Sequence, residues 1–184
     1  MSKKHLLLLV LFLLSLTNSY GGSSYTYTSI GILSDTENDK EALEYYEKGL
    51  KLYQDGKKKD GLKCIIKAID IWDKEIDANA TAGNACMLVG RIYLNNRQFT
   101  KAQIYAEKAL DIVSEIYDID NSIECAKAFR LLGETYFMQD KYDDAYMSFA
   151  SSYEIAKKLL GEKHQEVKQI EILMTASFSK MVGK

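Results

Sequence analysis

The chain has 184 residues and is nearly neutral, with 24 basic side chains against 26 acidic ones. Apolar residues make up 47% and charged residues 27%, which is an ordinary globular balance. This composition excludes a disordered chain, a collagen-like chain and a disulfide-dense miniprotein. The near-zero charge argues against a nucleic-acid partner, and the length suits one domain with a sizeable core.

The first residues have the pattern of a secretory signal peptide. A basic stretch with Lys3 and Lys4 precedes an unbroken apolar run at 6–14, and small polar residues follow it. A helix that spans a bilayer needs about 20 apolar residues, so a retained membrane anchor is the less favoured alternative. We expect removal of residues 1–19, with a cut after Ser19 or Gly21. The expected location is the lumen of the secretory pathway or outside the cell, with no stable membrane span after cleavage.

The rest of the chain divides into a leader and a helical domain at 39–184. Residues 20–38 are rich in Gly, Ser, Thr and Tyr and have no helical period, which predicts a flexible leader. From residue 39 onward, apolar residues recur at three- and four-residue spacing, and the chain contains no Pro. This pattern predicts seven helices, at about 39–55, 58–75, 79–96, 98–118, 121–140, 142–161 and 164–181.

Internal repetition is the strongest pattern in the sequence. Gly49, Gly90 and Gly133 are separated by 41 and 43 residues, and small residues follow each of them 12 and 19 positions later. A small residue on each of two helices allows a close approach, so each copy is expected to be an antiparallel helix hairpin. The predicted repeats are about 42–78, 83–120 and 126–161. The helix at 164–181 is expected to cap the stack with a polar outer face.

These positions resemble the tetratricopeptide repeat. The third copy matches its motif well and the second nearly as well, whereas in the first copy Leu52 and Gly61 replace the usual Tyr and Ala. The matching residues are Leu132, Gly133, Tyr136, Tyr142, Ala145 and Phe149, and before them Gly90, Tyr93, Phe99, Ala102 and Ala109. The family period is 34 residues, so the longer spacing resembles the kinesin light chain variety, as does the segment 160–167. The resemblance implies an all-α fold, a right-handed stack of antiparallel helix hairpins.

The resemblance also implies a binding groove on the concave side, which the first helix of each hairpin lines. The residues carried over to this groove are Tyr46, Leu50, Tyr53, Asn84, Met87, Arg91, Asn95, Lys127, Arg130, Glu134 and Phe137. Such a groove can take a peptide or protein segment with an apolar anchor and an acidic group, because Arg pairs well with carboxylates. In the alternative interpretation, Arg91, Lys127 and Arg130 form a solvated face.

Two further hypotheses concern the groove. Chaperone-binding members of the family clamp a C-terminal carboxylate with Lys and Asn side chains. Tyr46, Leu50 and Leu88 stand where that set would begin, so a two-carboxylate clamp is not expected. The Tyr-rich leader at 20–38 is a second candidate occupant, which the sequence leaves open.

The sequence offers few residues for chemistry. The three cysteines, Cys64, Cys86 and Cys125, cannot all pair within one chain; buried free thiols are the favoured interpretation, with one disulfide or an intermolecular bridge as alternatives. After cleavage His164 is the only histidine, and we find no phosphate-binding loop or catalytic motif. We therefore expect no enzyme activity, no cofactor and no metal site. Asn79 begins an N-glycosylation sequon.

Taken together, the sequence predicts a non-catalytic protein–protein interaction scaffold. The alternative is a structural or self-associating module, in which exposed ends of the stack pair with another copy.

Overall fold

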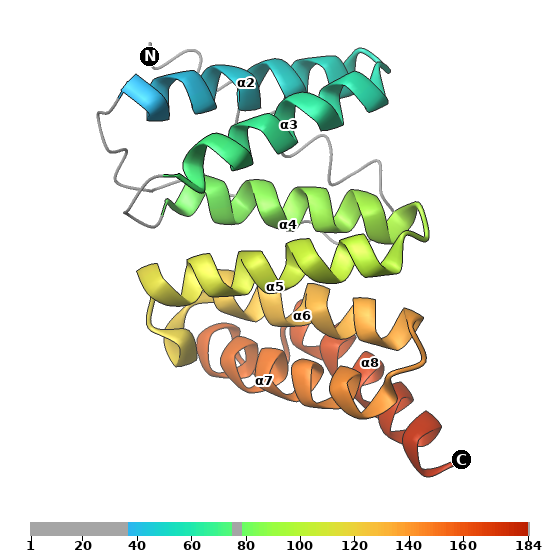
Figure 1. Cartoon of the computed structure of the whole chain (residues 1–184). Helices are drawn as coiled ribbons and strands as arrows, with labels where there is room; N and C mark the ends of the chain where they lie inside the picture. The colour runs from blue at the N-terminus through green and yellow to red at the C-terminus, as the bar shows by residue number, and fades with distance from the viewer. Residues whose placement is uncertain (1–36, 75–78, 184) are drawn as a thin grey trace.

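The computed structural model describes residues 37–74 and 79–183 (Figure 1). The predicted signal peptide and the predicted leader as far as residue 36 lie outside these residues. The helices that the structure describes are α2 (Glu37–Gln54), α3 (Lys58–Trp72), α4 (Ala80–Asn95), α5 (Phe99–Ile116), α6 (Ile123–Met138), α7 (Tyr142–Leu160) and α8 (Gln165–Val182). The predicted helices agree with these within three residues at each end.

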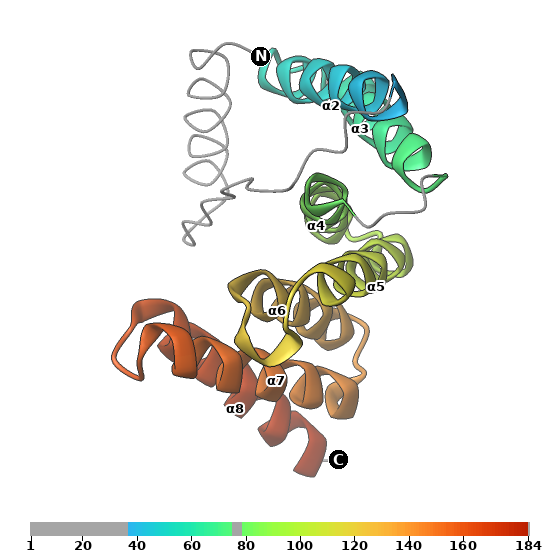
Figure 2. The same ribbon diagram turned by 90° about the vertical axis from the view of Figure 1, so that its left-hand side faces the viewer.

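The helices form a single stack of antiparallel hairpins. The pairs α2–α3, α4–α5 and α6–α7 follow one another from one end of the molecule to the other, and α8 packs against α7 at the far end (Figures 1 and 2). Successive hairpins meet where α3 contacts α4 and where α5 contacts α6. One hydrophobic core runs through the whole stack, from Ala42 on α2 to Ile170 on α8. The predicted all-α hairpin stack is confirmed.

The repeat register is also visible in the hairpin turns. The residue seven positions after each repeat glycine has a positive φ: 82° at Gly56, 57° at Arg97 and 61° at Asp140. In all three turns, the next residue donates its backbone N–H to the carbonyl of the residue three positions after the repeat glycine, over 2.9–3.0 Å. These acceptors are Leu52, Tyr93 and Tyr136. The three copies therefore share a turn conformation as well as a sequence pattern.

The repeat glycines allow the two helices of a hairpin to approach closely. A Cβ atom placed on Gly61 would lie 2.7 Å from the carbonyl oxygen of Gly49, and one on Gly49 would lie 2.8 Å from that of Gly61. At Gly133 the nearest atoms are instead those of the Phe149 ring, at 2.8 Å. Phe149 and its equivalent Ile65 are fully buried. This column, sixteen positions after the glycine, packs the hairpin. Phe149 was among the predicted motif residues, whereas its equivalent Ile65 was not.

Two of the three cysteines take the favoured form, a buried free thiol. All three are free thiols; Cys86 and Cys125 are buried and Cys64 is half-buried. Burial raises the pKa of the Cys86 thiol to about 12, which keeps it protonated and unreactive at neutral pH. Cys86 and Cys125 act as small apolar side chains of the core.

Two features differ from the expectations. A 3₁₀ turn, η1 (Ile119–Asn121), separates α5 from α6, and the Asp118 side chain caps it by accepting from the Asp120 N–H. The outer face of α8 is only partly polar, because Ile172 and Val182 are 68% and 62% exposed. Ser177, which was expected on that face, is buried. Within residues 37–74 and 79–183, no helix combines the length and the hydropathy that crossing a bilayer requires.

Candidate functional site: the concave face of the stack

The repeat register arranges the predicted groove residues in columns across α2, α4 and α6. One position after the repeat glycine stand Leu50, Arg91 and Glu134, and three positions before it stand Tyr46, Met87 and Arg130. The remaining predicted groove residues lie further along the helices from the repeat glycine. Asn84 and Lys127 stand six positions before it, Tyr53 and Phe137 four positions after it, and Asn95 five positions after it. Because α4 and α6 contact each other, side chains of equal register lie next to each other. The face therefore changes from apolar and aromatic on α2 to charged on α6.

A charged cluster joins the three C-terminal helices of this face. Glu134 on α6 accepts from the Arg91 guanidinium on α4, and from Arg130 Nε one turn away at 2.9 Å. Arg130 Nη2 also donates to Gln169 Oε1 on α8 at 3.4 Å. The exposed fractions of the Arg91, Glu134 and Arg130 side chains are 27%, 16% and 8%. We call Arg91, Arg130 and Glu134 the arginine cluster.

The electrostatics of the arginine cluster favour its ionised form. Burial by itself raises the pKa of Glu134, but attraction to Arg91 and Arg130 and the hydrogen bonds from both outweigh it and hold this pKa below its usual value. Burial lowers the pKa of Lys127, against the opposing effect of Glu124 and Glu166. Two guanidinium groups thus share one carboxylate.

The apolar part of the face is closely packed. Tyr46, Leu50 and Met87 are 3% or less exposed, and the Tyr46 ring meets Trp72 edge-on with its centroid 5.9 Å away. Asn84 and Tyr53 are each 9% exposed, whereas Asn95 is exposed. These five predicted groove residues are thus buried, whereas Asn95 is accessible; their role in binding stays a prediction. Sequence reasoning placed Glu134 in the groove but missed its role in joining the two arginines.

Asn79 lies at the join between the first and second hairpins. It is the N-cap of α4: its Oδ1 accepts from the N–H groups of Thr81 at 2.8 Å and Ala82 at 3.3 Å. Its Nδ2 donates to Asp39 Oδ1 on α2 at 3.2 Å, and the residue is 9% exposed. A glycan is attached through this same Nδ2 atom, so glycosylation would replace one of the two N–H groups of the atom that contacts Asp39. Glycosylation of Asn79 stays a prediction.

Replacing Asn79 with alanine is expected to lower the free energy of unfolding by about 1–2 kcal/mol, because it removes the cap of α4. Urea unfolding followed by circular dichroism measures this loss. Asn96→Ala is the matched control, since Asn96 is exposed at the other end of α4, and a change of only about 0.5 kcal/mol or less is expected there. A loss for Asn79→Ala no larger than for Asn96→Ala would contradict the capping role.

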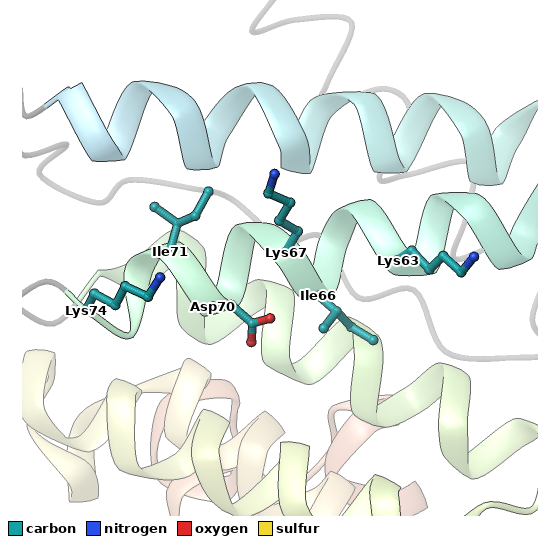
Figure 3. Close-up of a pocket in the computed structure, with 6 residues that line it drawn as sticks. All are labelled: Lys63, Ile66, Lys67, Asp70, Ile71 and Lys74. Atoms are coloured by element: carbon teal, nitrogen blue, oxygen red, sulfur yellow. The ribbon is translucent and has the colours of Figure 1, made fainter.

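Two shallow depressions lie elsewhere on the surface of the described residues. The first, of about 470 Å³, is lined by α3 residues, including Lys63, Ile66 and Lys74 (Figure 3). Lys67 reaches from it toward α2, where its Nζ donates to Tyr45 Oη at 2.6 Å. The second, of about 360 Å³, lies between η1 and α7. Both are open surfaces. Lys63, Lys67, Asp70 and Lys74 line the first, but Figure 3 shows these charged side chains pointing in different directions, so they do not converge as the polar groups of a ligand site do. Residues of η1, α6 and α7 line the second.

The described residues contain no group of three or more His, Cys, Asp or Glu side chains that could hold a metal ion. His164 is the N-cap of α8, and its Nδ1 accepts from the Glu166 N–H at 3.2 Å. This histidine therefore serves as a helix cap.

Comparison with known families decides what kind of repeat this is. A sequence model described as "Tetratricopeptide repeat" matches residues 83–158, which cover α5, α6 and most of α4 and α7. Residues 83–158 are tetratricopeptide repeats. The resemblance seen in the sequence is thus confirmed. The first hairpin, α2–α3, continues the same register outside the matched segment.

Solved structures share the tetratricopeptide repeat fold of this chain. BtubC (BKLC) from P. vanneervenii superposes with a TM-score of 0.69 over 82% of this chain, at 17% identity, and the match spans 60% of BtubC. The N-terminal domain of stress-induced protein-1 from C. elegans gives a TM-score of 0.57 at 18% identity, over 76% of this chain and 98% of that domain. The first tetratricopeptide repeat domain of Spaghetti (RPAP3), bound to the HSP90 peptide SRMEEVD, gives 0.53 at 19% identity, over 79% and 99%. At these identities the likeness concerns the fold.

Proposed function

We propose that this tetratricopeptide repeat chain is a non-catalytic interaction module whose concave face binds a polypeptide segment of another protein. The segment carries an acidic group that lies at the arginine cluster and an apolar side chain that lies toward the aromatic end at α2. The observation that carries this proposal is the arginine cluster, in which two guanidinium groups on adjacent first helices share one carboxylate. Arg is suited to this role because its fixed fork of donors can hold two carboxylates at once.

The fold supports the binding of a polypeptide but does not indicate which protein is bound. A related fold has been solved with the peptide SRMEEVD bound, which is acidic. This chain has Tyr46, Leu50 and Leu88 where the chaperone-binding members have their clamp, so we expect a different ligand. We place its action in the secretory pathway or outside the cell, on the signal-peptide pattern of residues 1–19.

A random peptide library panned on the purified chain tests the proposal. The selected peptides are expected to share an acidic residue and a large apolar one, and to lose about tenfold or more in affinity for Arg91→Gln. Arg97→Gln is the matched control, because Arg97 is an exposed arginine in a hairpin turn. Peptides without acidic residues, or equal affinity for both variants, would reject the arginine cluster as the binding site.

A further inference from the structure

The two ends of the stack differ in chemistry. On α2, the exposed side chains include Lys40, Glu41, Glu44 and Lys48, and none of the exposed large hydrophobic residues among those described lies on this helix. On α8, in contrast, Ile172, Phe178 and Val182 are 68%, 46% and 62% exposed. The first end is a polar cap, whereas the second leaves apolar surface in water.

The exposed residues of α8 form a seam. Ile172, Thr175, Ser179 and Val182 are all exposed and are spaced three, four and three residues apart. This is the alternating spacing of a helix that packs along one stripe against another helix. On the opposite side of α8, Val167 and Ile170 are buried in the core of the stack. We call the four exposed residues the α8 seam.

The α8 seam is complementary to itself when two copies run antiparallel. With the two-fold axis between Thr175 and Ser179, Ile172 of each copy lies opposite Val182 of the other, and Thr175 lies opposite Ser179. Apolar residues thus meet apolar residues, hydroxyl groups meet hydroxyl groups, and no charged residue stands in the four layers. The pairing also continues the alternation of the stack, in which each helix is antiparallel to the one before it (Figure 1).

We propose that the α8 seam is a dimer interface, in which α8 of a second copy of this chain packs antiparallel across a two-fold axis. A head-to-tail contact with the α2 end is disfavoured because the charged side chains of that end would have to be desolvated against Ile172 and Val182. A two-fold contact uses the same patch on both copies and closes on itself, so it gives a dimer rather than a filament. One helix pair is a small interface, so we expect a dissociation constant of about 10–100 µM.

Sedimentation equilibrium of the purified chain over about 1–500 µM tests the interface at concentrations that bracket this affinity. The chain is expected to shift from monomer to dimer, and Ile172→Asp is expected to stay monomeric. Ile104→Asp is the matched control: Ile104 is 55% exposed on α5, so this variant should dimerise as the parent does. Circular dichroism checks that both variants keep their helices. A monomeric parent at 500 µM, or an Ile172→Asp variant that still dimerises, would overturn the proposal.

Disulfide trapping tests the antiparallel register, in a Cys64→Ser background that removes the half-buried thiol. Thr175→Cys chains mixed with Ser179→Cys chains are expected to form a disulfide-linked dimer under mild oxidation, several-fold faster than either variant alone. Glu44→Cys, on the polar end, should not cross-link. Equal rates for the mixture and for each variant alone would reject this register and with it the proposed interface.

Discussion

Gly61→Ala is expected to destabilise the protein by about 2–3 kcal/mol, although alanine is the better helix former. The added Cβ would lie 2.7 Å from the carbonyl oxygen of Gly49 and 2.7 Å from the backbone nitrogen of Tyr53. These are backbone atoms of the facing helix, so they cannot move aside as a flexible side chain would, and α2 has to shift away from α3. Thermal unfolding should show a melting temperature about 4–12 °C lower.

Gly90→Ala is the matched control for Gly61→Ala. Its Cβ would meet the end of the Leu131 side chain at 3.0 Å, while the nearest backbone atoms of the facing helix are 3.5 Å away. A leucine methyl can rotate aside, and the gain in helix propensity opposes the remaining strain. We expect a change within about 1 kcal/mol. Equal losses for Gly61→Ala and Gly90→Ala would show that the first hairpin is not packed more closely than the second.

Glu134→Gln is expected to lower the free energy of unfolding at pH 7 by about 2–3 kcal/mol. The substitution keeps the shape of the side chain but leaves Arg91 and Arg130 close together without their shared anion. Both arginines are less than a third exposed, so water replaces the lost carboxylate only in part. Chemical denaturation measures the loss, and Glu115→Gln, at an exposed position on α5, is expected to change the stability by about 0.5 kcal/mol or less.

The contribution of Glu134 to the free energy of unfolding should depend on pH. Because Glu134 has a lowered pKa in the folded state, its stabilising effect is fully present above the ordinary carboxyl pKa of about 4.3 and is lost as the pH falls through the lower folded value. The stability difference between the parent and Glu134→Gln should therefore shrink below about pH 4. A difference that stays constant from pH 7 to about pH 3 would contradict the ion-pair account of the arginine cluster.

The backbone was predictable because its causes are periodic and local. Gly49, Gly90 and Gly133 set the register, and polar turn residues separate helices whose apolar positions recur at helical spacing. The turn η1 escaped prediction because the Asp118 side chain, rather than a periodic pattern, builds it. Asn79 was visible as a sequon, but its bond to Asp39 joins residues 40 positions apart and depends on how two hairpins meet.

The candidate site was predictable in its residues but not in their pairing. The register placed Arg91 and Glu134 at equivalent positions of adjacent repeats, which could have indicated an ion pair between α4 and α6. The role of Gln169 could not be read in the same way, because it requires α8 to pack beside α6 as a fourth first helix. The α8 seam was missed because three polar residues, Ser177, Ser179 and Lys180, were given more weight than the positions of Ile172 and Val182.

Photo-cross-linking tests the central claim, that the concave face holds the ligand, most directly. A selected acidic peptide carrying a benzophenone group is irradiated with the purified chain, and the adducts are mapped by mass spectrometry. We predict adducts on the exposed rim of the concave face, at Asn95 and at Met138, which is 45% exposed, and their loss in Arg91→Gln. Adducts confined to the convex helices α3, α5 and α7, unchanged in that variant, would contradict the account.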